Sequence, residues 1–291
     1  MTDVVLGFKA FDIHELLCHF VAKEAGLYEQ QGLNVKLVDT NFAADQALPE
    51  LFFSTACGAA LAGWLNGTPQ KVIFVATDRP LFWLYGRDGL CDKDAPESLQ
   101  GLSHCRIAGY PEFAPPTHFL NAILAQGGLN PRTVIESIPA RDDTARIGLL
   151  VAGDVDAAVI SSALPPAVMA KYGLKPLLFF GEHLRIPTTG LVIHPSLVER
   201  HPDVVGAMVS VYRQSLQLIN GDDNLVRKVL GQYFAIPLRG LGTTSDLVRQ
   251  CFCSDGQSST AILEEAIKVM QLQLQCDDPP VVNALYDFSY C

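Results

Sequence analysis

Side chains able to bind or protonate a small molecule follow the first apolar stretch of the sequence, VVLGF (4–8). Phe11, Asp12 and His14 come directly after it. An aromatic ring offers a flat contact, a carboxylate accepts hydrogen bonds, and an imidazole transfers protons near neutral pH. We therefore expect these three residues to contact a ligand. His14 is an acid/base candidate if the protein is an enzyme.

A second group of candidates, Thr55, Cys57 and Gly58, precedes the helical run AALAGWLNG (59–67). Small residues at a helix N-terminus expose backbone N–H groups, and the helix dipole there favours an anion. We expect these residues to bind a ligand, with Cys57 as the nucleophile of an enzyme. Alternatively, Thr55 is an ordinary N-cap of the helix.

The segment GYPEFAPPTHFLNAIL (109–124) combines a strand end, a proline-rich turn and a helix that we expect to start at Thr117 or His118. This order repeats that of the preceding group of candidates. Tyr110, Thr117 and His118 are therefore predicted to contact the ligand, and His118 is a further acid/base candidate.

Arg141 follows another strand in IPARDD (138–143). A guanidinium can hold a carboxylate or sulfonate by two parallel hydrogen bonds, although Arg141 can equally form a surface ion pair with Asp142 or Asp143. Ser161 and Ser162 end the DAAVI strand, where their hydroxyls either bind a ligand or cap the next helix.

The sequence predicts no metal site and no cofactor. The metalloprotease pattern needs a second histidine four residues after His14, but Cys18 occupies that position and His19 is rotated by about 100° on a helix. No phosphate-binding loop, dinucleotide-binding glycine motif or hydrolase serine motif is present.

Short apolar stretches and amphipathic segments alternate along most of the chain, which is typical of an α/β protein. The expected strands are VVLGF (4–8), NVKLVD (34–39), KVIFVAT (71–77), LFWLYG (81–86), RIAGY (106–110), DAAVIS (156–161) and GLVIH (190–194). After Ser196 the pattern becomes almost continuously helical, with expected helices over 201–219, 224–234, 245–252 and 258–272.

Two polar, turn-rich stretches, 87–101 and 188–190, are candidate crossovers between two lobes. They predict that residues 1–87 and 188–291 form the first lobe and that 88–187 form a second lobe inserted into it. In open α/β sheets ligands bind beyond the carboxyl ends of strands, so we expect a ligand cleft between the lobes.

The chain has 291 residues and a formal net charge of −10, which disfavours nucleic acid as a partner. No apolar run is long enough to span a bilayer, so no membrane insertion is expected. The N-terminus lacks a signal-peptide pattern and the eight cysteines are scattered, which predicts free thiols and a cytoplasmic location. If a leader has been removed, the location is periplasmic or extracellular.

Four segments, in order, resemble the type II periplasmic-binding-protein fold, in the branch of the sulfonate, taurine and nitrate solute-binding proteins and the thiamine-pyrimidine synthases. These segments are VAKEAGLYEQQGLNVKLVD (21–39), SLQGLSHCRIAGYP (98–111), GLLVAGDVDAAVISSALPPAVMAKYGLKPL (148–177) and LVIHPSLVERHPDVVGAMVSVY (191–212). The resemblance implies a two-lobed α/β fold with a helical C-terminal tail.

The resemblance also implies a protein that closes on a small anionic ligand, of the sulfonate, nitrate or aromatic acid class, with an ABC transporter as a partner. The alternative is a cytoplasmic synthase, decarboxylase, desulfinase or dehydratase acting on an aromatic or heterocyclic substrate. A third reading is a cytosolic ligand sensor. In either of the first two readings, a flat ligand would be suited by the aromatic residues Phe11, Phe53, Tyr110 and Phe113.

Overall fold

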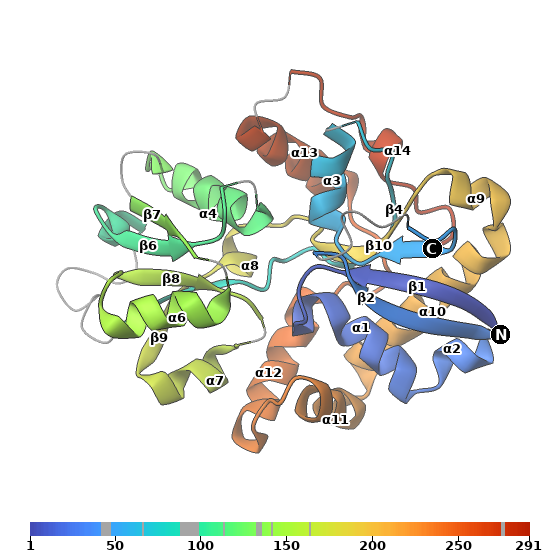
Figure 1. The fold of residues 1–291 in the computed structure, drawn as a ribbon, viewed down its shortest axis with the longest axis horizontal. Helices are drawn as coiled ribbons and strands as arrows, with labels where there is room; N and C mark the ends of the chain where they lie inside the picture. Colours follow the sequence, from blue (N-terminus) through green and yellow to red (C-terminus); the bar gives the residue numbers. More distant parts are fainter. Residues whose placement is uncertain are drawn as a thin grey trace. The chain divides into compact units, whose positions relative to one another are not determined.

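The computed structural model describes residues 1–41, 48–65, 67–87, 99–112, 114–131, 136–140, 142–162, 164–274 and 277–291. These residues form two compact units. The first unit comprises Met1–Pro80 and Arg185–Cys291, and the second comprises Leu81–Leu184. Figure 1 shows both units coloured along the chain.

The first unit is built on a sheet of five strands in the order β2-β1-β3-β10-β4. The strands are β1 (Thr2–Phe8), β2 (Leu33–Asp39), β3 (Phe52–Ser54), β4 (Lys71–Thr77) and β10 (Thr189–Ile193). β1 is parallel to β2 and β3, whereas β10 runs antiparallel to β3 and β4. β4 and β10 are almost entirely buried, as expected of apolar, β-branched strands covered on both faces.

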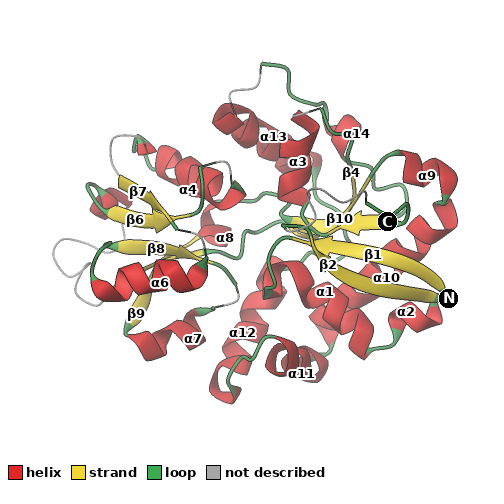
Figure 2. Cartoon of the chain, in the orientation of Figure 1, coloured by secondary structure: helices red, strands yellow, loops and turns green. Residues whose placement is uncertain are grey.

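Helices cover this sheet in two groups, which Figures 1 and 2 show above and below the strands. One group packs around α1 and α10, and the other consists of α3, α13 and α14. The helices of this unit are α1 (Ile13–Glu24), α2 (Leu27–Gln30), α3 (Cys57–Leu65), α9 (Ser196–Arg200), α10 (Pro202–Gly221), α11 (Asp223–Tyr233), α12 (Leu238–Cys251), α13 (Thr260–Leu274) and α14 (Val282–Leu285).

The second unit contains a separate five-stranded sheet in the order β7-β6-β8-β5-β9. Its strands are β5 (Trp83–Arg87), β6 (Arg106–Gly109), β7 (Glu136–Pro139), β8 (Ala157–Ile160) and β9 (Leu174–Phe179). Its helices are α4 (Pro115–Gln126), α6 (Asp143–Ala152), α7 (Pro166–Met169) and α8 (Phe180–His183), with 3₁₀ turns at Leu99–Leu102 and Ala170–Tyr172. β6 is parallel to β7 and β8, and β5 runs antiparallel to β8 and β9.

All seven stretches expected to be strands contain strands of the two sheets. The first expected crossover lies largely in residues 88–98, outside the described residues. The division between the units falls after Pro80 rather than after residue 87, because β5 pairs with β8 and β9 of the second sheet. The second division falls after Leu184, three residues before the expected one.

One helix is longer than the sequence predicts. We expected a helix from residue 245, but α12 begins at Leu238 and includes the glycine-containing stretch LRGLGTT. Its small residues Gly240 and Thr244 are buried, and α12 packs against α11. Close packing between the two helices therefore outweighs the low helix propensity of glycine.

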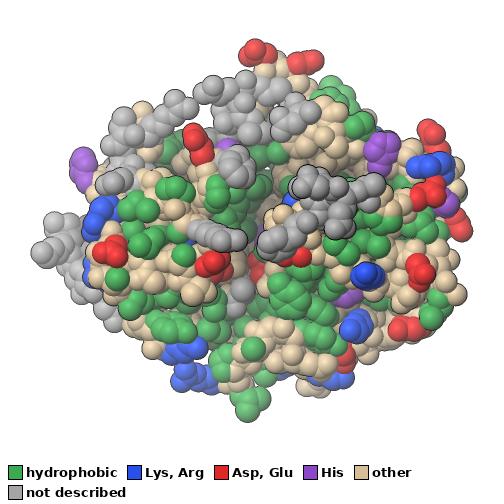
Figure 3. All heavy atoms as spheres, in the orientation of Figure 1, with side chains coloured by type: hydrophobic (Ala, Val, Ile, Leu, Met, Phe, Trp, Pro, Cys, Tyr) green, Lys and Arg blue, Asp and Glu red, His purple; other side chains and the backbone are tan. Residues whose placement is uncertain are grey.

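The surface and the thiols agree with a globular protein. On the face drawn in Figure 3, acidic and basic side chains are interspersed. None of the helices in the described part of the chain has the length and apolar character needed to cross a bilayer. Cys18, Cys57, Cys253 and Cys291 are free thiols.

Candidate functional site

The carboxyl ends of three strands meet at one edge of the first sheet. β1 and β3 are parallel, and Thr77 at the end of β4 pairs with Thr189 at the start of the antiparallel β10. The segments that follow β1, β3 and β4 and the segment that precedes β10 therefore lie at the same edge. This is the edge at which open α/β sheets bind ligands.

At this edge Glu15 ties the segment after β1 to the segment after β3. Its carboxylate accepts hydrogen bonds from the backbone N–H groups of Lys9 (2.9 Å) and Ala10 (3.1 Å) and from the hydroxyl of Thr55 (2.6 Å). Burial raises the pKa of the Glu15 carboxyl, although these three hydrogen bonds oppose the shift. The Thr55 hydroxyl is thus engaged by Glu15 rather than capping α3. Asp12 is buried and caps α1, because its carboxylate accepts the N–H of Glu15 at 2.9 Å.

His14 is buried and belongs to a chain of threonine hydroxyls. Its Nε2 lies 2.6 Å from the Thr188 hydroxyl, which lies 2.7 Å from that of Thr77. The Thr77 hydroxyl lies 2.8 Å from that of Thr189, which donates to the carbonyl of His14 at 3.0 Å. Burial lowers the pKa of His14 to about 3, so the imidazole is neutral at physiological pH.

The Thr188 hydroxyl has a further partner, because it also donates to the Thr77 carbonyl at 3.2 Å. Nε2 of His14 is therefore engaged by a hydroxyl that belongs to a hydrogen-bond network within the protein.

Cys57 and Gly58 begin α3, but the structure corrects the expected anion site. The Gly58 N–H donates to the carbonyl of Thr188 at 3.1 Å, so it is not exposed to a ligand. The Cys57 thiol is buried and donates to the carbonyl of Phe74 at 3.7 Å. Burial raises the pKa of this thiol, the opposite of what activates a nucleophile.

The two aromatic candidates of the first unit differ in exposure. Phe53 is fully buried in the core and is unavailable to a ligand. Phe11 is 52% exposed, and its ring is backed by Phe8, Phe20 and Phe234 at centroid distances of 6.0, 5.7 and 6.1 Å.

The second sheet has a corresponding edge, where the parallel strands β6, β7 and β8 end and β5 begins. Tyr110, Ala140 and Ser161 directly follow the three parallel strands. At the same edge Trp83, the first residue of β5, pairs with Ile160, the last residue of β8.

Arg146, on the first turns of α6, joins these strand ends. Its side chain is 2% exposed. Its guanidinium donates to the Ala140 carbonyl (2.9 Å) and to the Asp143 carboxylate (2.6 Å), and it lies 3.7 Å from the centre of the Tyr110 ring. Asp143 also accepts the Ser161 hydroxyl at 2.6 Å. The Nε–H of Arg146 is buried and has no hydrogen-bond acceptor among the described residues.

The other candidates of the second unit lie near this edge or outside the described residues. α4 begins at Pro115, before the expected start, because proline suits the first helical positions. The Thr117 hydroxyl donates to the carbonyls of Tyr110 and Pro111, both at 3.0 Å. His118 is buried on α4, and Ser162 is fully buried after β8. Arg141 and Phe113 lie outside the described residues.

Comparisons with known proteins identify the architecture. No protein-family model and no curated protein matches the sequence. The periplasmic aliphatic sulphonate binding protein SsuA from Escherichia coli superposes with a TM-score of 0.77 at 10% identity, over 97% of this chain and 96% of that one. The chain has the type II periplasmic-binding-protein fold.

Two other structures show how varied proteins with this fold are. The ligand binding component of an ABC-type import system from Staphylococcus aureus, solved with zinc bound, gives a TM-score of 0.72 at 15% identity over 100% and 98% of the chains. The desulfurization enzyme DSZB gives 0.73 at 13% identity over 99% and 97%. Because binding proteins and an enzyme share the periplasmic-binding-protein fold, function has to be argued from the site.

Several polar residues at these edges were not among the sequence candidates. Glu15 holds the segment after β1, and Asp78, which is buried, forms an ion pair with Arg185. Arg146 lies at the strand ends of the second sheet. The sequence does carry a signal for Arg146, because it lies four residues before the buried Leu150 on the apolar face of α6.

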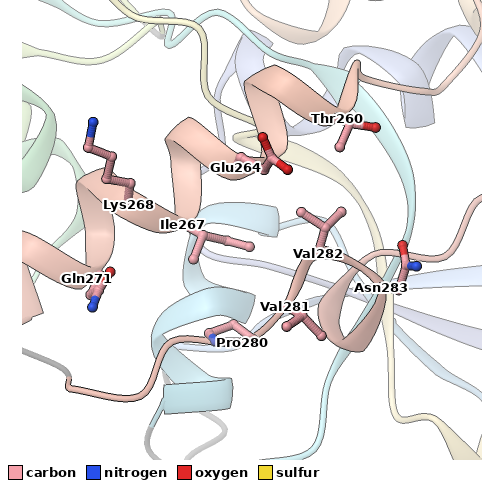
Figure 4. Close-up of a pocket in the computed structure, with 9 residues that line it drawn as sticks. All are labelled: Thr260, Glu264, Ile267, Lys268, Gln271, Pro280, Val281, Val282 and Asn283. Atoms are coloured by element: carbon pink, nitrogen blue, oxygen red, sulfur yellow. The ribbon is translucent and has the colours of Figure 1, made fainter.

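A pocket in the first unit lies away from the strand ends. It has a volume of about 440 Å³, and Figure 4 shows Ile267 of α13 pointing toward Val282 of α14. None of the candidate site residues lines it. The described residues also contain no cluster of three or more His, Cys, Asp and Glu side chains that could hold a metal ion.

Proposed function

We propose that this protein binds a small organic or inorganic anion without transforming it, and that Arg146 is the anion-binding group. The observation that carries the proposal is the buried guanidinium at the carboxyl ends of β6, β7 and β8, with a buried Nε–H that no described residue accepts. Buried polar groups are almost always hydrogen-bonded, so an unmatched donor at a ligand-binding edge indicates a ligand acceptor.

The surroundings of Arg146 suit recognition by hydrogen bonds more than by net charge. Asp143 balances the guanidinium charge, while the Ala140 carbonyl and the Tyr110 ring fix its orientation. Side chains held in this way lose little conformational entropy when they bind a planar or tetrahedral acid group. Carboxylates, sulfonates and nitrate all offer suitable oxygen atoms.

The candidate catalytic groups of the first unit favour binding over chemistry. Cys57 is a buried, protonated thiol, and burial lowers the pKa of His14 to about 3 while its Nε2 is hydrogen-bonded to Thr188. Neither arrangement provides the activated nucleophile or the poised base that an enzyme needs.

The fold supports the same proposal and suggests a partner. The resembling proteins include a sulphonate binding protein and a component of an ABC-type import system. In this proposal the chain delivers its ligand to an ABC transporter, which would place it outside the cytoplasmic membrane.

The test is isothermal titration calorimetry with ethanesulfonate, benzenesulfonate, benzoate and nitrate. Removing Arg146 alone leaves Asp143 as an uncompensated, mostly buried charge, so the informative variant is the double substitution Arg146→Gln with Asp143→Asn. We expect it to weaken binding by roughly 1.5–3 kcal/mol, the contribution of a hydrogen bond to a charged group.

The matched control is Arg106→Gln. Arg106 lies at the start of β6, at the opposite end of the strand, and its side chain is 42% exposed beside Asp156. The Arg106→Gln substitution should leave the affinity for these anions unchanged. Binding that survives in the double variant, or is lost equally in the control, would contradict the role of Arg146.

A further inference from the structure

We infer that the ligand is an aromatic acid and that Phe82 and Tyr110 supply the contact to its ring. This inference rests on the proposed anion-binding function and narrows its ligand class. Both side chains are only partly buried, and both lie at the same edge of the second sheet as Arg146.

Phe82 is held as a rigid aromatic surface. It directly precedes β5, and its carbonyl accepts the N–H of Phe180 at 3.0 Å. Its ring packs against the buried rings of Phe119 and Phe180 at centroid distances of 6.5 and 6.2 Å. The buried rings fix Phe82 on one side, so a ligand that contacts Phe82 does not have to order a mobile side chain.

Tyr110 connects this aromatic surface to the guanidinium. Its ring meets Phe82 edge to face, with a centroid distance of 5.8 Å and an interplanar angle of 89°. The Arg146 guanidinium lies over the Tyr110 ring at 3.7 Å. A cation and two partly exposed rings are therefore contiguous within one unit.

This combination matches an aromatic acid better than the other anions of the proposed class. Nitrate has no apolar surface to cover the rings, and a short alkanesulfonate gains apolar burial without the edge-to-face and stacking attractions of a second aromatic ring. A benzene ring bearing a carboxylate, sulfonate or sulfinate places apolar and acidic groups on one rigid frame, as the site does.

The first unit independently presents an aromatic ring at the corresponding edge of its own sheet. Phe11 is half-exposed, and Glu15 holds the N–H groups of Lys9 and Ala10 just before it. The polar candidates Thr55 and Gly58 at that edge are already engaged within the protein.

The experiment compares benzenesulfonate with ethanesulfonate, which carry the same acid group. We expect the wild-type protein to prefer benzenesulfonate by about tenfold, the upper range for one aromatic pair. Phe82→Leu should remove most of this preference while leaving the affinity for ethanesulfonate within about twofold. Phe82→Tyr, which keeps the ring, should retain the preference.

Tyr172→Leu is the matched control, because Tyr172 is an exposed aromatic residue of the same unit that lies against Lys171. Tyr172→Leu should change neither the affinity for benzenesulfonate nor that for ethanesulfonate. Equal or tighter binding of ethanesulfonate, or a preference that survives in Phe82→Leu, would overturn the inference while leaving the proposed function standing. Failure of the wild-type protein to bind any of the anions would instead overturn the proposed function.

Discussion

Two buried histidines should make the protein less stable in mild acid. Burial lowers the pKa values of His14 and His19 from 6.5 to about 3. Between these values the unfolded chain binds protons that the folded protein does not, so stability falls as the pH falls below 6.5. From pH 7 to pH 5 each histidine should cost about 2 kcal/mol, and the two together about 4 kcal/mol.

Urea denaturation at pH 7 and pH 5, followed by tryptophan fluorescence, measures this difference. The variant His14→Gln with His19→Asn keeps a hydrogen-bonding group at each position and removes both titrations. Between pH 7 and pH 5, the free energy of unfolding of this variant should fall by about 4 kcal/mol less than that of the wild-type protein. The raised pKa of Glu15 acts in the opposite direction, because a carboxyl that protonates more readily when folded gains stability in acid, but it is common to both proteins.

An unchanged pH dependence in the His14 and His19 variant would refute the reasoning, because it would mean that neither imidazole is held neutral by burial.

Two further predictions concern the first unit. Gly190→Ala should destabilise the protein by more than about 3 kcal/mol in urea denaturation, because the new Cβ would lie 1.9 Å from the Phe74 carbonyl oxygen. The control is Gly148→Ala, which has open space around the new Cβ and should be neutral or slightly stabilising. Equal effects of the two substitutions would contradict the steric argument. Cys57 should resist iodoacetamide in the native protein and react only after denaturation, as read by peptide mass mapping, because its thiol is buried and protonated; rapid native labelling would show an accessible thiolate.

The strands and the resemblance to a two-lobed fold could be predicted from the sequence because they depend on local patterns. The stretch KVIFVAT (71–77) is rich in β-branched residues, and β4 spans the same seven residues, nearly all of them buried. The start of α12 could not be predicted in the same way. Leu238 and Gly240 have the composition of a loop, and only packing against α11 makes the segment helical.

The location of the candidate site was predicted better than the roles of its residues. His14, Thr55 and Gly58 were expected at a strand edge, and they lie there. Their hydrogen bonds to Glu15 and Thr188 could not be predicted, because Glu15 is 40 residues from Thr55 and Thr188 is 174 residues from His14.

Native mass spectrometry of protein purified from its source cells decides the claim that the protein holds a small anion and leaves it unchanged. We expect one bound anion of small mass per chain, which is lost on denaturation and keeps its mass after prolonged incubation. A bound species that is converted with time into a product of different mass would contradict the claim and identify the protein as an enzyme.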